Sequence, residues 1–125
     1  MGRAPRRLAR PGIDSRALAR LRRQGGVDLV REVIAIFCED MPGRLSQGRI
    51  GAETNDLDAT RRAAHSLKGT AATVGAVRLQ ELSELIELLA ERREGQAVAA
   101  LLADWEASFS AARHDLTLAL DRGAI

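Results

Sequence analysis

Aromatic residues are almost absent from this chain, which has two Phe, one Trp and no Tyr among its 125 residues. β-Sandwiches and β-barrels depend on aromatic and β-branched side chains, so this composition favours helices that pack through Leu, Ile and Ala. The length allows a single domain. Apolar residues at 46% and charged residues at 29% are typical of an ordinary globular protein.

Cysteine, histidine and long apolar runs are also scarce. The single cysteine, Cys38, excludes a disulfide framework and most cysteine-based metal sites. The two histidines, His65 and His114, are too far apart in sequence to indicate a zinc site. No apolar run approaches the roughly 20 residues that cross a bilayer, and the basic N-terminus lacks the apolar stretch of a secretory signal. We therefore expect a cytoplasmic protein that has no cofactor, no bound metal and no membrane contact.

Positive charge is concentrated at the N-terminus. The first 23 residues carry a net charge of +7, whereas the remaining 102 carry −5. Residues 1–12 contain four Arg, two Pro and little to bury, which predicts a flexible basic arm. Basic tails bind nucleic acid or acidic lipid, but no aromatic residues interleave these arginines for stacking on bases. We therefore expect a solvated arm and no nucleic-acid partner.

Apolar residues recur at three- and four-residue spacing, which predicts helices. Asp14 is expected to cap a short helix that ends at Gly25 and Gly26. In the longer segment that follows, Pro42 is expected to kink the helix or to split it in two. The apolar stripe of this segment consists of Val30, Val33, Ile34, Phe37, Met41 and Leu45.

Three more helical segments follow. Asn55 or Asp56 is expected to cap the first of them, which closes at Gly75, and apolar seams over 79–89 and 98–120 mark the other two. No segment shows the sustained two-residue alternation of a strand. Four long amphipathic helices with short connections predict an all-α, antiparallel, up-down-up-down four-helix bundle. The short first helix is expected to pack over one end, and the domain to cover residues 13–121.

His65 stands out in the third segment because of its neighbours. On a helical wheel, Lys68, Gly69 and Ala72 fall within about 60° of His65, and the apolar residues fall on the opposite half. His65 is therefore expected on the solvent-exposed face, with Asp58, Arg61 and Arg62 beside it. Glycine costs about 1 kcal/mol relative to alanine inside a helix. Gly69 therefore indicates a cleared approach to the imidazole, beside a cation that can meet an anion.

Residues 64–76, with the sequence AHSLKGTAATVGA, closely resemble the signature of the histidine-containing phosphotransfer (HPt) domain family. The stretch from Phe37 to Pro42 resembles the family's Phe-x-x-Asp-x-Pro pattern, and Asp56 occupies the position of the Asp before its histidine helix. Residues 79–87 resemble the helix that follows. The resemblance covers residues 13–120, and it matches the family in motif, helix number and spacing together.

The resemblance implies a four-helix bundle that displays one reversibly phosphorylated histidine. By that resemblance His65 is the phosphoryl acceptor, Lys68 steadies the phosphoryl group, and Gly69 leaves room for an incoming receiver domain. A neutral imidazole has a free lone pair for attack, and phosphoryl transfer consists mostly of positioning and charge neutralisation. We therefore expect a phosphoryl carrier rather than an enzyme, without its own ATP-binding or metal site. The resemblance places Mg²⁺ on the partner receiver, beside its aspartate.

The expected function is that of a phosphorelay protein, in which His65 accepts a phosphoryl group from one receiver aspartate and passes it to another. The expected partners are response-regulator receiver domains and a sensor or hybrid histidine kinase, and the chain is expected to be a monomer. One alternative is the substrate domain of a chemotaxis-type histidine kinase, phosphorylated directly from ATP. A third hypothesis is a helical interaction module that binds nucleic acid through its basic arm, with His65 incidental.

Glu87 lies on a polar edge with Gln80, Ser83 and Glu84, where family members often place Gln or, in chemotaxis-kinase relatives, Glu. A carboxylate that accepts a hydrogen bond from Nδ1–H of His65 would fix the tautomer and leave Nε2 as the nucleophile. A solvated helix charge is the alternative, and the residues alone leave both open.

The family typically meets the receiver with an apolar patch near the histidine. Leu18, Leu21 and Phe37 are the candidates for this patch, although each of them also fits the core. Arg61 and Arg62 are expected to form a positive rim, and Ala72 to line the docking face. Three other conspicuous residues are given no role at the site, since Trp105 and Phe109 are expected in the core and His114 on the surface.

Overall fold

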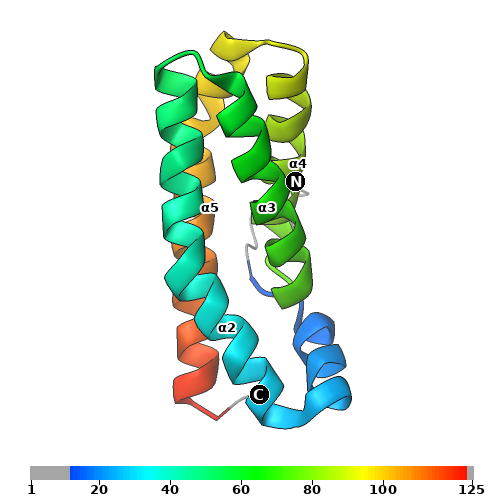
Figure 1. Ribbon diagram of the computed structural model, residues 1–125. Coiled ribbons are helices and arrows are strands. Elements are labelled where there is room, and N and C mark those ends of the chain that lie inside the picture. Colours follow the sequence, from blue (N-terminus) through cyan, green and yellow to red (C-terminus); the bar gives the residue numbers. More distant parts are fainter. Residues whose placement is uncertain (1–11, 124–125) are drawn as a thin grey trace, which may run out of the picture.

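The structure is a computed structural model that describes residues 12–123. Its four helices are α2 (Ser15–Glu53), α3 (Leu57–Val74), α4 (Val77–Glu91) and α5 (Gly95–Asp121). α3 packs against α2 and α4, and α5 packs against the same two helices, which gives the expected antiparallel four-helix bundle (Figure 1). The predicted basic arm lies outside the described residues except for Gly12. Within the described part of the chain, no helix has both the length and the apolar character to span a membrane.

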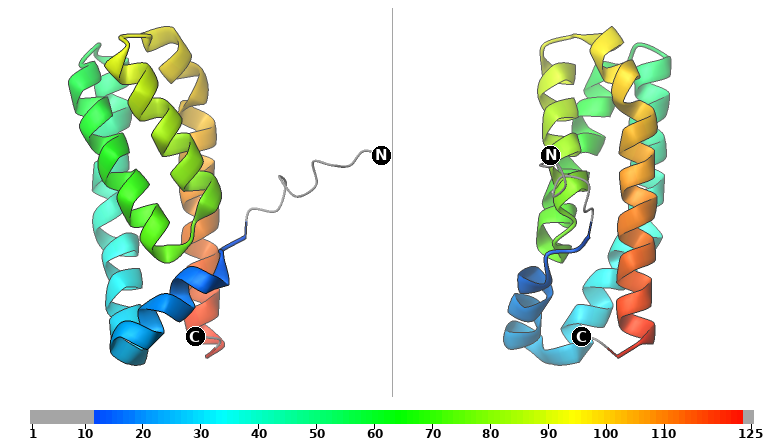
Figure 2. Two further views of the ribbon diagram at one scale, coloured as in Figure 1. Left: turned by 90° about the vertical axis from the view of Figure 1, so that its right-hand side faces the viewer. Right: turned by 180° about the vertical axis from the view of Figure 1, so that it is seen from behind.

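The short first helix forms the beginning of α2 and ends where the sequence predicts. Gly25 and Gly26 have non-helical backbone, and the φ of 74° at Gly26 is in the left-handed region that favours glycine. Before this break the chain crosses one end of the bundle (Figure 2, left). Leu18 and Leu21 are buried there, so this helix closes the end of the core.

Pro42 does not split the long helix. Inside α2 only the two glycines depart from helical φ and ψ, so the backbone stays helical through Pro42 to Glu53. A proline inside a helix removes one ladder hydrogen bond and costs about 3 kcal/mol. Phe37, Met41 and Leu45 lie on either side of it and all pack into the core, and that burial holds the helix together. Of the two outcomes expected at Pro42, a kink or a split into two helices, the split is therefore wrong.

Both ends of α3 are fixed by specific contacts. The Asp56 side chain accepts a hydrogen bond from the backbone N–H of Ala59 at 3.2 Å, as an N-cap does. Gly75 closes the helix in a left-handed conformation with φ of 80°. Its carbonyl accepts a hydrogen bond from the N–H of Asp14 at 2.8 Å, which attaches the first helix to the α3–α4 turn. His65 lies midway between these two caps, on a rigid element.

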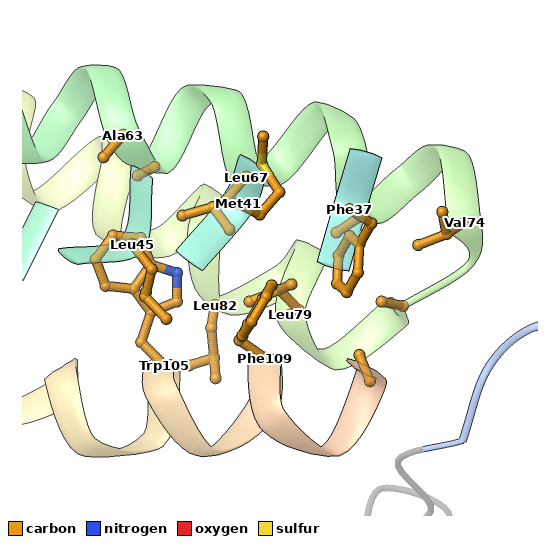
Figure 3. Packing of buried hydrophobic residues seen from close by; sticks show 14 of the residues in the cluster. Phe37, Met41, Leu45, Ala63, Leu67, Val74, Leu79, Leu82, Trp105 and Phe109 are labelled. Carbon is orange, nitrogen blue, oxygen red and sulfur yellow. The ribbon is translucent and has the colours of Figure 1, made fainter. Parts of the chain in front are cut away.

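The core runs along the bundle axis and receives side chains from all four helices (Figure 3). Phe37 stacks on Phe109 with ring centroids 5.0 Å apart. Trp105 is fully buried and its Nε1–H donates to Ser83 Oγ at 3.0 Å. The core assignment of Trp105 and Phe109 is confirmed. The placement of Ser83 on a polar edge is wrong, because the buried indole needs this hydroxyl as its hydrogen-bond partner.

Gly48 allows α2 and α3 to approach closely beside the tryptophan. A Cβ at this position would lie 2.7 Å from the indole of Trp105 and 2.9 Å from Ala63 Cβ. The Gly48 carbonyl also accepts a hydrogen bond from the buried Thr60 hydroxyl at 2.9 Å. This contact sets the spacing between α2 and the histidine-bearing helix, and the periodicity of the sequence gave no sign of it.

Candidate functional site

His65 projects from the middle of α3 into solvent, and 67% of its side chain is exposed. The opposite face of the same helix buries Ala63, Leu67 and Val74 in the core. The helical wheel drawn from the sequence is therefore correct for this helix. Because His65 takes no part in core packing, its imidazole is available for chemistry.

Glu87 of α4 contacts His65 and Lys68 at the same time. Its Oε2 lies 2.8 Å from His65 Nδ1, and its Oε1 lies 2.7 Å from Lys68 Nζ. The contact between Glu87 and His65, which the sequence left open, is thus present. The ion pair with Lys68 was not anticipated. Its only sign in the sequence is the three-residue spacing of His65 and Lys68, which directs both side chains to the same place on α4.

The charges at this site determine which ring nitrogen is free. Partial burial opposes ionisation of Glu87, but hydrogen bonds from Lys68 and His65 outweigh it and hold the pKa of Glu87 below its usual range. The hydrogen bond to Glu87 in turn raises the pKa of Lys68, so at neutral pH the pair is a carboxylate and an ammonium. A carboxylate can only accept, so Nδ1 of His65 must donate, and Nε2 of the neutral ring keeps its lone pair.

The surface next to the imidazole is open. A Cβ built on Gly69 would have no atom within 4 Å of it. Gly69 and Ala72 are both exposed, so two of the surface positions in the turns that follow His65 carry small residues. This is the cleared approach that the sequence predicts.

A basic hollow lies on the other side of His65, between the C-terminal half of α2 and the N-terminal half of α3. It has a volume of about 590 Å³, and Arg44, Arg61 and Arg62 line it, with His65 at the same surface. Arg44 Nη1 donates to the hydroxyl of Ser66 at 3.4 Å. The sequence indicated Arg61 and Arg62 but not Arg44, because the contribution of Arg44 depends on how α2 and α3 pack.

The apolar docking patch expected from the sequence is not present. Leu18 and Leu21 are each only 8% exposed, and Phe37 is fully buried. The break at Gly25 and Gly26 turns the first helix so that its leucines face the end of the core. These three residues are therefore core residues, which corrects their assignment to docking. Among residues 12–123, no group of three or more His, Cys, Asp or Glu side chains is placed to hold a metal ion.

The family model of the Hpt domain matches residues 32–120 of this chain. The chain belongs to the Hpt domain family. This Hpt domain is similar to the crystal structure of histidine-containing phosphotransfer protein B (HptB) from Pseudomonas aeruginosa PAO1, with 30% sequence identity and a TM-score of 0.83. The similarity covers 91% of this chain and 98% of that one. A comparison with curated proteins gave no match. The predicted family and the predicted all-α fold are confirmed.

The contact of Glu87 with the imidazole predicts a defined tautomer for this Hpt domain. In the native chain we expect ¹⁵N spectra of the His65 ring to show a protonated Nδ1 and an unprotonated Nε2. Glu87→Ala should lose this preference and shift toward protonated Nε2, because nothing then holds the proton on Nδ1 and a free neutral imidazole in water favours the Nε2–H tautomer. Glu87→Gln should weaken it, because its single amide oxygen cannot accept from both Nδ1–H and the Lys68 ammonium. Identical ring spectra for the native chain and Glu87→Ala would show that the contact does not persist in solution.

The ion pair between Lys68 and Glu87 predicts a pH-dependent stability. The pKa of Glu87 is lower in the folded chain, so its contribution is present above the unfolded pKa and is lost as pH falls through the folded pKa. The pKa of Lys68 is raised, so its contribution is lost as pH rises through the folded value. Thermal melts should therefore show the largest difference between native and Glu87→Ala near neutral pH. A difference that is constant from acid to alkaline pH would contradict this prediction.

Proposed function

We propose that this Hpt domain is a phosphorelay carrier, in which His65 takes a phosphoryl group from the aspartate of one receiver domain and passes it to another. The observation that carries this proposal is the exposed His65 ring, whose Nδ1 contacts the Glu87 carboxylate. Such a ring is oriented by one nitrogen while the other remains free as a nucleophile.

In the proposed reaction, Nε2 of His65 attacks the phosphorus of the receiver's aspartyl phosphate. The N–P bond forms as the P–O bond to the aspartate breaks, and the aspartate leaves as a carboxylate. The same step in reverse passes the phosphoryl group to the second receiver. Glu87 stabilises the positive charge that develops on the ring, through Nδ1–H. Lys68 has three N–H donors, so it can offset phosphoryl charge while it remains paired with Glu87.

In this proposal the receiver approaches over Gly69 and Ala72, where the side chains of α3 are small. Arg61 and Arg62 lie on the other side of His65, in the basic hollow, and form a positive rim for an acidic receiver face. The Mg²⁺ that phosphoryl transfer requires is supplied by the receiver, beside its aspartate. A carrier must release each partner quickly, so the interface should be small and of modest affinity.

The alternative, a substrate domain phosphorylated directly by a chemotaxis-type kinase, is favoured by one observation, the contact of a glutamate with the histidine. Two incubations separate the two functions. Phosphorylated receivers without ATP should transfer label to the Hpt domain, whereas [γ-³²P]ATP with a histidine-kinase catalytic domain and no receiver should not. Label acquired only in the second incubation would support the alternative, and label acquired in neither would refute both.

The positive rim should accelerate receiver association. Arg61→Glu with Arg62→Glu is expected to lower the association rate constant by about tenfold at low salt, because electrostatic steering acts mainly on encounter. The dissociation rate should change less, and the effect should fade at high salt as screening sets in. Arg113→Glu on α5, combined with Arg122→Glu immediately after that helix, makes the same change in net charge away from His65 and serves as the control. Equal losses in both double variants would assign the effect to net charge rather than to the rim.

A further inference from the structure

The outer face of α4 is unusually apolar for a solvent-exposed surface of this molecule. Five large apolar side chains are more than 40% exposed in the described residues, and three of them, Val77, Leu85 and Leu88, lie on α4. A groove of about 510 Å³ runs along this face toward Lys68 of α3. This groove, here called the α4 groove, is lined by Lys68, Glu81, Glu84, Leu85, Glu87, Leu88 and Glu91.

The α4 groove combines its apolar floor with negative charge. The Glu87 carboxylate is already paired with His65 and Lys68. Glu81, Glu84 and Glu91 form no ion pair with any residue in the range 12–123. A segment that fits this groove therefore needs several cations and at least one apolar side chain.

The described chain begins beside the N-terminal end of α4, the helix that lines most of this groove. Ile13 forms an antiparallel β-bridge with Ala76, the residue immediately before α4. The first described residues accordingly lie beside the start of α4 (Figure 2, left). The 11 preceding residues of the sequence reach about 36 Å when extended. The 15 residues of α4 span only about 22 Å, so the segment is long enough to follow the whole helix.

The chemistry of that segment complements the groove. Residues 1–11 contain Arg3, Arg6, Arg7 and Arg10, with no acidic residue and with Leu8 in the middle. We propose that residues 1–11 dock along the α4 groove, with their arginines paired to its glutamates and Leu8 against Leu85 and Leu88. Each exposed ion pair contributes little by itself. The tether supplies an effective concentration in the millimolar range, so a weak contact is sufficient.

Docking of residues 1–11 would leave only one side of His65 accessible to a partner. The segment would cover the α4 side, next to Glu87 and Lys68, and leave the basic hollow lined by Arg61 and Arg62 open. An acidic receiver would then meet His65 from the α2–α3 side. This consequence rests on the proposed function, whereas the docking itself does not.

Paramagnetic relaxation in the full chain tests the docking without any phosphotransfer assay. A nitroxide is attached at Gly2→Cys in a Cys38→Ser background, and amide signals are recorded with the label oxidised and reduced. At low salt the amides of 81–91 should lose most of their intensity, because even a partly populated docked state brings the nitroxide close to them. The intensity should return at high salt. If Cys38→Ser lowers the melting temperature, Cys38→Ala replaces it.

Two triple variants serve as a matched pair in the same background. Glu81→Gln, Glu84→Gln and Glu91→Gln together should abolish the loss of intensity on α4. Glu32→Gln, Glu39→Gln and Asp40→Asn remove the same charge from exposed positions on α2 and should leave it unchanged. No loss on α4, or equal responses of the two variants, would overturn the proposal. In a second sample, nitroxide-labelled chains are mixed with ¹⁵N-enriched chains that carry no nitroxide. If the α4 signals of the enriched chains also lose intensity, the groove binds a second copy of the chain, and the proposal is overturned as well.

Discussion

His65→Gln is expected to abolish phosphorylation of this Hpt domain while leaving it folded. The side chain is 67% exposed, and the buried residues of α3 lie on the opposite face. Its replacement removes no core packing, so the free energy of unfolding should change by no more than about 0.5 kcal/mol, as for other surface substitutions. Glutamine has no nucleophilic nitrogen, so the acid-labile, base-stable label of a phosphohistidine should disappear completely.

His114→Gln is the matched control for this experiment. His114 is also exposed, but it lies on α5, which packs against α2 and α4 rather than against α3. Its replacement should leave both the label and the melting temperature unchanged. Label that survives in folded His65→Gln and disappears in the double variant would identify His114 as the acceptor and contradict the proposed site.

The bundle could be predicted from the sequence because the apolar pattern within each helix identifies the face that is buried. Apolar residues at three- and four-residue spacing identify the face of α3 that packs inward, and His65 then follows on the outward face without knowledge of any other helix. The caps are equally local, since Asp56 and Gly75 act within one turn of the helix ends. These features were predicted correctly because they depend on a single helix.

Contacts between helices were much harder to predict from the sequence. The pairing of Lys68 with Glu87 and the hydrogen bond from Arg44 to Ser66 each join residues on two helices. Such contacts depend on the axial register of the two helices, which the apolar pattern does not specify. The pattern also identifies Leu18, Leu21 and Phe37 as apolar without showing which of them is covered. All three are buried, the two leucines because the first helix folds back over the end of the core and Phe37 because it packs against Phe109 of α5.

Gly69→Leu should raise the stability of this Hpt domain and slow its proposed phosphotransfer. Leucine is the better helix former, and the site is open, since a Cβ at Gly69 has no neighbour within 4 Å. The variant should therefore gain up to about 1 kcal/mol of stability. The leucine would project into the space that the receiver must occupy one turn from His65. Because small misplacements of reacting groups have large effects, the phosphotransfer rate should fall on the order of a hundredfold.

Gly43→Leu on α2 provides the comparison for this variant. Gly43 is also an exposed helical glycine at which a Cβ has no neighbour within 4 Å. The same substitution there should raise the melting temperature to a similar extent and leave phosphotransfer unchanged. Gly69→Ala should lie between native and Gly69→Leu in rate, because its methyl group fills less of the approach. If folded Gly69→Leu transfers at the native rate, the receiver does not pass over this part of α3, and the proposed docking face must be placed on the side of the basic hollow alone.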